Sequence, residues 1–433
     1  MIARTGCTYG RIAEMTNRVG GEDGADLRCA ASSLGRWLNG TIPMPAVMAA
    51  AVEAFARLLD RPGLTAADLG WPTETIPPPD DPWHGDPVAW VAHLGRDDML
   101  NRRTALTSGL YSLAAATLPD RSHKITDRTG PARRAGQSDA ERIRTATEHF
   151  GVLDDMYGGG HARSAVAAYL THDVAPLLRG TTGRARPALF LAAAELTYLA
   201  GWMAADSMRT GLAQRYYVQS VRLAEEAEDP IMRSTALRSL AVQAIELGHN
   251  RAGRDLADAA ADGIKAGSPV RTRAWITGMC AEAHAAASHD RHRARSLLRK
   301  AEADLDRADS LPESELFGNY RRTSFNHQVG LTLAQLGDLR GAEEHFAVSV
   351  GSRLTVERRS RALIGARLAH VQLRQRHPEQ AANTLIGLSD DLAVVSSERT
   401  RRILTEIRRT WQPLLTVPKV GEADRLLATL PKP

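Results

Sequence analysis

Residues 323–346, TSFNHQVGLTLAQLGDLRGAEEHF, carry the pattern that decides the fold. The small residue Gly330 stands twelve positions before Ala342, and the large apolar Phe346 follows four positions after it. Between them, the Leu-Gly-Asp-Leu stretch at 336–339 is typical of a turn. Small residues let two helices approach closely, while a large side chain fills the space beside them. The stretch therefore predicts two antiparallel helices packed against each other.

The same spacing recurs along the C-terminal part of the chain. Five units carry an alanine and a large apolar residue four positions later, with steps of 39, 42, 48 and 39 residues. The pairs are Ala213 and Tyr217, Ala252 and Leu256, Ala294 and Leu298, Ala342 and Phe346, and Ala381 and Leu385. Gly201 and Ala369 stand twelve positions before two of these alanines, as Gly330 does. Such recurrence indicates stacked supersecondary units.

These units resemble the tetratricopeptide repeat (TPR), a pair of antiparallel helices with a small residue at the crossing point. The resemblance implies an all-α fold in which a TPR-like helical-hairpin solenoid follows a small N-terminal domain. The hairpins are expected over residues 186–393, and the flanking helices near 139–156, 162–178, 397–414 and 421–430. Closing helices cover the last apolar face of a solenoid. The alternative is a non-repetitive helical bundle in which alanines recur through composition.

Composition agrees with a soluble helical protein. The chain has 433 residues, 43% of them hydrophobic, 24% charged and 5% aromatic, with a formal net charge of +5. Abundant Ala, Leu and Arg favour helices, and the length predicts more than one domain. Its three cysteines show no metal-binding or disulfide pattern, and no apolar run is long enough for a membrane helix. We therefore expect a cytoplasmic protein that does not bind a membrane.

The N-terminal segment is predicted to be a separate domain. Five prolines between residues 72 and 82 cannot continue a helix and indicate a spacer. The expected division is an N-terminal domain at 1–71, a proline-rich linker with connector helices at 72–138, and the solenoid at 139–433.

Two short helices and a longer one are predicted within residues 1–71. Thr8 is suited to cap a helix that carries its apolar residues on one face. An Asn-Gly pair ends a second helix at 32–38, and a third is expected over 45–59. The seven residues before Thr8 leave room for only a short helix in front of these.

This segment resembles the Xre (phage-repressor-like) helix-turn-helix family. The matching positions are Thr8, Tyr9, Ile12 and Ala13 in one helix and Ser32, Ser33, Arg36, Trp37 and Gly40 around the recognition helix. The resemblance implies that Leu34 and Trp37 are core residues. It also implies that Ser32, Ser33 and Arg36 face the major groove and that Thr8 or Tyr9 contacts phosphate. Arg and hydroxyl side chains suit such contacts. Because such heads bind paired half-sites, a homodimer on a double-stranded DNA operator is implied.

The hairpins are expected to offer a second binding surface. In a solenoid, the first helices of successive hairpins line the concave face. These helices are expected near residues 195–203, 234–247, 274–287, 323–336 and 359–374. The polar or aromatic residues on them that are candidates for binding a peptide or small-molecule effector are Trp202, Gln243, Trp275, Asn326 and His327. The alternative is that each of them faces solvent or bridges neighbouring helices.

Taken together, the chain is similar to cytoplasmic transcriptional regulators of high-GC bacteria that join an Xre-like head to a TPR-like body. We expect the body to sense a peptide, a small molecule or a protein and to support dimerisation. No catalytic motif is visible, so an enzyme is not expected, nor is a cofactor or metal. The alternative is a TPR scaffold that binds proteins and not DNA. Residues 1–70 favour it, because their seven arginines are balanced by seven acidic residues.

Overall fold

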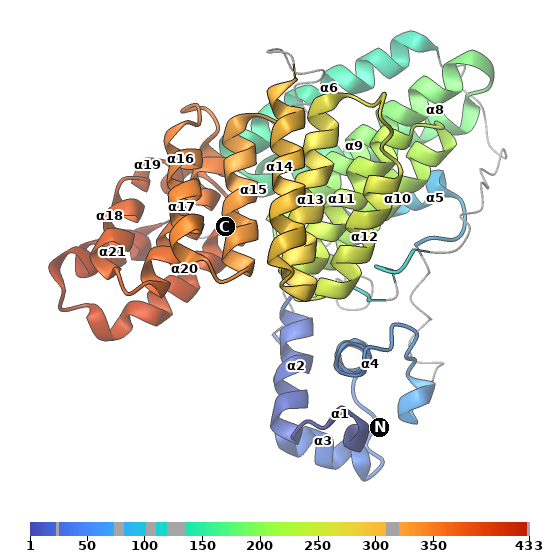
Figure 1. The fold of residues 1–433 in the computed structure, drawn as a ribbon. Helices are drawn as coiled ribbons and strands as arrows, with labels where there is room; N and C mark the ends of the chain where they lie inside the picture. Colours follow the sequence, from blue (N-terminus) through green and yellow to red (C-terminus); the bar gives the residue numbers. More distant parts are fainter. Residues whose placement is uncertain are drawn as a thin grey trace. The chain divides into compact units, whose positions relative to one another are not determined.

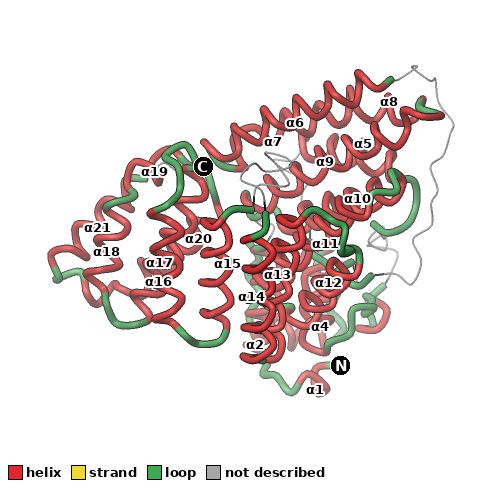
Figure 2. The backbone as a smooth tube through the Cα atoms, turned by 45° about the horizontal axis from the view of Figure 1, so that its top comes forward, coloured by secondary structure: helices red, strands yellow, loops and turns green. Residues whose placement is uncertain are grey.

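The computed structural model describes residues 1–22, 26–72, 82–100, 110–113, 115–118, 136–308 and 320–430. Within these ranges every regular element is a helix, which confirms the predicted all-α class. Most of the helices follow one another as antiparallel pairs, visible as repeated hairpins in Figures 1 and 2. Most of the predicted proline spacer, residues 73–81, lies outside the described residues.

By its internal contacts the chain divides into two compact units. Unit 1 comprises Met1–Ala140 and Ser164–Glu228, and unit 2 comprises Glu141–Arg163 and Asp229–Pro433. This division differs from the boundaries expected near residues 71 and 138. The first repeat-like hairpin groups with the N-terminal segment, whereas the later hairpins form the other unit.

The N-terminal part of unit 1, residues 1–72, is a small helical head. Its helix α2 packs against both α3 and α4. Ile12 and Leu34 are fully buried in the core that these helices share, and Phe55 is almost so. The head helices begin and end close to the predicted residues. They are α1 (Ile2–Thr5), α2 (Tyr9–Gly21), α3 (Ala31–Leu38), α4 (Pro45–Leu59) and the 3-10 turn η1 (Ala67–Leu69).

The rest of unit 1 is built around the hairpin of α9 and α10. A Cβ atom added to Gly201 of α9 would lie 2.8 Å from the Tyr217 ring of α10, so the predicted close crossing is confirmed. By length and composition α9 could cross a membrane, but 72% of the apolar window in Gly183–Asp206 is buried within the protein. Its apolar residues therefore serve packing. The elements are α5 (Pro87–Leu100), α8 (Ala175–Gly180), η4 (Gly183–Ala185), α9 (Arg186–Asp206) and α10 (Thr210–Glu226).

The helix predicted near residues 162–178 is present, but it contains a π-helical turn. Helix α7 (Gly159–Tyr169) is followed by a π-helical turn, η3 (Leu170–Val174), before α8 begins. Pro176 has no amide hydrogen, so it cannot donate to a carbonyl one turn earlier in a regular helix. The wider turn adapts the backbone to this missing donor.

Unit 2 contains four helical hairpins at the predicted places. A Cβ atom added to Gly330 would lie 2.6 Å from the ring of the buried Phe346, so these residues meet as their spacing predicts. The key alanines Ala294, Ala342 and Ala381 are fully buried. The hairpins are α11 (Pro230–Glu246) with α12 (Asn250–Asp262), α13 (Val270–Ser288) with α14 (Arg291–Asp306), α15 (Arg322–Gln335) with α16 (Leu339–Gly351), and α17 (Arg358–Arg374) with α18 (Pro378–Ile386).

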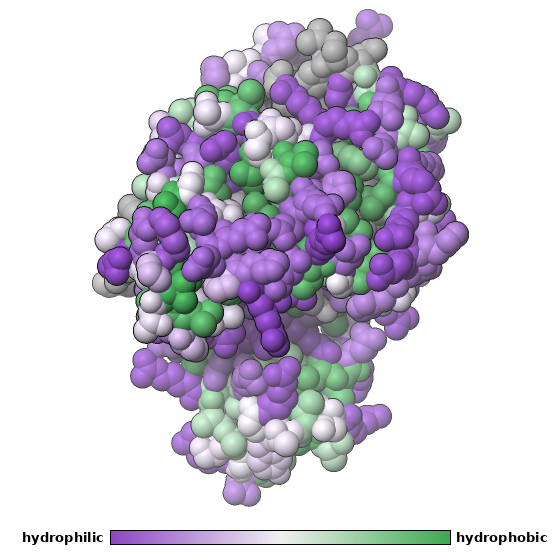
Figure 3. All heavy atoms as spheres, turned by 60° about the vertical axis from the view of Figure 1, so that its left-hand side comes forward, coloured by the Kyte–Doolittle hydropathy of each residue, from purple (hydrophilic) through white to green (hydrophobic). Residues whose placement is uncertain are grey.

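The chain ends in helices that pack on the last hairpin, as the sequence predicts. Trp411 is fully buried there, and its indole Nε1 donates to Asp424 at 3.1 Å. In the view of Figure 3, hydrophilic side chains cover most of the visible surface and apolar ones form small patches. The remaining elements are α6 (Gln137–Tyr157), α19 (Ser389–Val394), α20 (Glu398–Trp411), η5 (Gln412–Leu414) and α21 (Pro418–Thr429).

Candidate functional site

The start of α2 places Thr8 and Tyr9 at an exposed helix N-terminus. Thr8 caps the helix, because its Oγ1 accepts a hydrogen bond from the Arg11 amide at 3.3 Å. Tyr9 is exposed beside it. Unpaired amides and the helix dipole favour an anion at such an end. The Thr8 hydroxyl still has a proton to donate, so both residues are available to a phosphate.

Helix α3 presents Ser32 and Arg36 to solvent, but not Ser33. Ser33 is only 7% exposed, and its Oγ accepts hydrogen bonds from the Ala30 amide at 3.2 Å and from Arg36 Nη2 at 3.4 Å. Its hydroxyl therefore stabilises the start of α3 and orients Arg36. Of the three residues expected to face the major groove, the structure exposes Ser32 and Arg36 and turns Ser33 inward.

Cys29, just before α3, is bonded by a side chain of α2 that the sequence did not single out. The Asn17 amide makes two bonds to the Cys29 backbone: Nδ2 donates to the carbonyl at 2.9 Å, and Oδ1 accepts from the amide at 2.8 Å. Leu34 is fully buried, as expected for a core residue. Trp37 is partly buried and packs edge to face on Trp71, with ring centroids 5.5 Å apart. These contacts attach the start of α3 to α2 and its end to Trp71.

Beside Arg36 the head exposes an apolar patch that the sequence reading also missed. Leu38, Ile42 and Met44 are 58%, 54% and 72% exposed. Arg36 is the one charged residue between positions 29 and 52. The part of the surface that this stretch forms therefore carries a single charge. It suits contact with bases or with apolar groups better than a dense array of phosphates.

In unit 2, three of the predicted effector residues lie on the first helices of hairpins, among partly or fully buried charges. Gln243 of α11 is buried, and Trp275 of α13 is partly buried. The guanidinium of Arg238 stacks 4.2 Å from the centroid of the Trp275 ring. Arg238 Nη2 also lies 3.4 Å from Gln328 Oε1. Aromatic and amide groups thus line this part of the unit.

His327 of α15 belongs to the same polar region. Its Nε2 accepts a hydrogen bond from Arg367 Nη1 at 2.6 Å, and Arg367 also donates to Glu246 at 2.7 Å. Arg399 donates to the same carboxylate. Burial, together with nearby arginines, above all Arg367, lowers the pKa of His327 well below its usual range. His327 is therefore neutral, as its acceptor role requires.

The other two predicted effector residues lie elsewhere. Asn326 Oδ1 is 2.8 Å from Nδ1 of His345 on α16, so its side chain bridges the two helices of its own hairpin. Trp202 belongs to α9 in unit 1. Arg238 stacks on Trp275, and both Arg238 and Arg367 act on His327, so these two predicted residues lie beside the same buried charges of unit 2. Among the described residues no group of three or more His, Cys, Asp or Glu side chains could hold a metal.

One comparison with known families matches the head. The profile of the SP15 N-terminal domain family matches residues 1–72. No curated protein matches the chain, and neither does any solved structure. The matched range coincides with the head, residues 1–72.

Proposed function

We propose that the chain is a DNA-binding transcriptional regulator whose head binds an operator. The observation that supports this most is the orientation of α3. Its Leu34 side is buried in the core, while Ser32 and Arg36 face outward. Helix α2, which packs against α3, has an exposed start at Thr8. An exposed Arg on a short, rigidly held helix suits bidentate reading of guanine in the major groove.

Selection of genomic DNA fragments by the purified protein tests this proposal and gives the operator. On that operator, Arg36→Ala is expected to weaken binding about 5- to 150-fold, since a bidentate base contact is worth about 1–3 kcal/mol. Arg61→Ala is the matched control, because Arg61 is also an exposed arginine of the head but lies beyond the end of α4. Equal binding by both variants at fixed salt would contradict the proposed role of α3.

We propose further that the hairpin body senses an effector and that the regulator acts as a homodimer in the cytoplasm, without catalysis, a cofactor or a membrane. Trp275 and His327 lie beside the same buried charges, and Gln243 is buried on α11, which supports a site for a peptide or small molecule in unit 2. Amides can bind a peptide backbone, and an indole ring can pack on its side chains. Native mass spectrometry of the purified protein reports a retained ligand. Sedimentation equilibrium reports the dimer that paired half-sites require.

An adaptor that binds a protein through the head is the second candidate. The exposed Leu38, Ile42 and Met44, next to the single charge of Arg36, favour it, because apolar surface of this kind marks protein contacts. The fragment selection separates the two candidates. Enrichment of one sequence supports the regulator, while retention of no DNA above background supports the adaptor.

A further inference from the structure

A short backbone segment, residues 110–113, joins the head to α10 within unit 1; we call it the strap. On the head side, the Leu113 amide donates to Glu53 Oε1 at 3.0 Å, and the Tyr111 carbonyl accepts from Arg57 Nη2 at 3.3 Å. Leu110 packs against the apolar cluster that contains Val19. The strap is therefore bonded to α4 and packed against α2.

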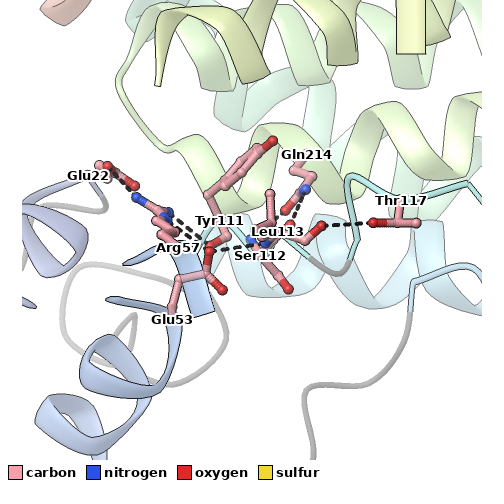
Figure 4. A network of polar contacts seen from close by, with 8 residues as sticks. All are labelled: Glu22, Glu53, Arg57, Tyr111, Ser112, Leu113, Thr117 and Gln214. Atoms are coloured by element: carbon pink, nitrogen blue, oxygen red, sulfur yellow. Dashed lines mark hydrogen bonds and ion pairs between the residues drawn. The ribbon is translucent and has the colours of Figure 1, made fainter. Parts of the chain in front are cut away.

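On its other side the strap is bonded by Gln214, a side chain of α10. Gln214 Nε2 donates to the Ser112 carbonyl at 2.7 Å, and Gln214 Oε1 accepts from the Ser112 amide at 2.8 Å. Figure 4 shows that consecutive strap residues form hydrogen bonds with different partners: Tyr111 and Leu113 bond the head, and Ser112 bonds α10. Ser112 thus connects the strap to Gln214 of α10, which lies 102 positions later in the sequence.

Burial makes these bonds costly to break. Gln214 is 1% exposed, so without the strap both ends of its amide would lose their partners away from water. Arg57 and Glu22 are equally hidden, with 5% of each side chain exposed and 2.7 Å between Nη1 and Oε1. Arg57 also bonds Glu53 through Nε at 2.8 Å. Displacing the strap would therefore leave buried polar groups without their partners, namely Gln214 on the α10 side and Arg57 and Glu53 on the head side.

A second contact anchors the same end of the head. Thr210 Oγ1, at the start of α10, donates to the Glu22 carbonyl at 3.3 Å, just beyond the end of α2. Helix α2 has 13 residues and is therefore about 20 Å long, with Thr8 and Tyr9 at its far end. A shift of α10 would act on α2 at one end and move the proposed DNA contacts at the other.

We propose that the strap couples the head to α10, so that a conformational change in the α9–α10 hairpin reaches the head through Gln214 and the Glu53–Arg57 pair. Gln214 is then a positioning residue for the head. The coupling itself does not depend on DNA binding. The proposed function adds only that the coupling would control the DNA contacts of the head.

Hydrogen exchange of the full chain in the absence of DNA tests the coupling. Gln214→Leu removes both bonds to Ser112 and is expected to speed exchange of the α2 and α4 amides at least 10-fold. The matched control is Gln219→Leu. Gln219 is fully buried on the same helix but bonds the Pro82 carbonyl at 2.7 Å. In this control the head amides should exchange within 2-fold of wild type.

Gln214→Asn keeps the amide but shortens the side chain by one methylene, so both bonds to Ser112 weaken without a buried charge, and it should give an intermediate acceleration. It also serves if the leucine variant does not fold. Unchanged head exchange in the Gln214 variants would overturn the coupling. Equal acceleration in Gln219→Leu would overturn it as well, because a general loosening of α10 would then suffice. Failure of DNA binding affects neither readout.

Discussion

In the head, Arg57 lies between two carboxylates at a buried junction, whereas in the hairpin of α15 and α16 the Phe346 ring fills the space left by Gly330. The first arrangement depends on a few directional bonds between charged groups. The second depends on shape, with no polar atom involved. Buried charges lose much stability when one partner is removed, while an apolar fit loses an amount that follows the size of the misfit. The two regions should therefore respond differently to single substitutions.

The largest expected effect is at Arg57. Arg57→Met leaves Glu22 and Glu53 buried without their shared counter-charge, which should lower the free energy of unfolding by about 3–5 kcal/mol. Urea denaturation of the two proteins measures the difference. Arg28→Met is the control, since Arg28 is 86% exposed and its ion pair with Asp26 should be worth almost nothing. A loss of less than 1 kcal/mol in Arg57→Met would contradict the view that the buried ion pairs of Arg57 stabilise the head.

The two regions also differ in how far the sequence predicted them. Gly330 and Phe346 lie in one hairpin and recur with a period, so their contact was predicted and is confirmed. The Gln214–Ser112 contact joins residues 102 positions apart and has no period to reveal it. Around α3 the sequence predicted the helix but not the orientation of Ser33. Only the hydrogen bonds at the helix start decide which serine is buried.

The apolar contact between Gly330 and Phe346 predicts a smaller loss of stability than the charged junction at Arg57. In Gly330→Ala the new methyl group would lie 2.6 Å from the Phe346 ring, so the ring or a helix must move, at a cost of about 1–3 kcal/mol. Gly351→Ala is the control, because nothing lies within 4 Å of a Cβ atom at that helical glycine. Thermal unfolding should separate the two variants. If both melt alike, the glycine is not needed for the close approach of α15 and α16.

The charged junction should also make stability depend on pH. Burial raises the pKa of Glu53 to about 7, against the pull of Arg57, whereas an unfolded glutamate titrates near 4.5. Between these values the folded state binds more protons, so stability should fall as pH rises from about 4.5 to 7 and then level off. The transition temperature of wild type should therefore fall more steeply over this range than that of Glu53→Gln. Parallel curves for the two proteins would show that Glu53 does not titrate in this way.

The smallest loss of stability is expected at Asn326, and a larger one at Gln328, two positions along the same helix. Asn326 is partly exposed, and its bonds to His345 and to the Arg322 carbonyl can be replaced by water. Asn326→Ala should therefore cost less than about 1 kcal/mol. Gln328, two positions along α15, is 3% exposed and donates to the buried Glu282 carboxylate. Gln328→Ala should cost about 1–3 kcal/mol, because that carboxylate loses a donor where water cannot replace it. Urea denaturation of both variants measures this gap. Equal losses would mean that burial does not set the cost of a polar truncation in the hairpins.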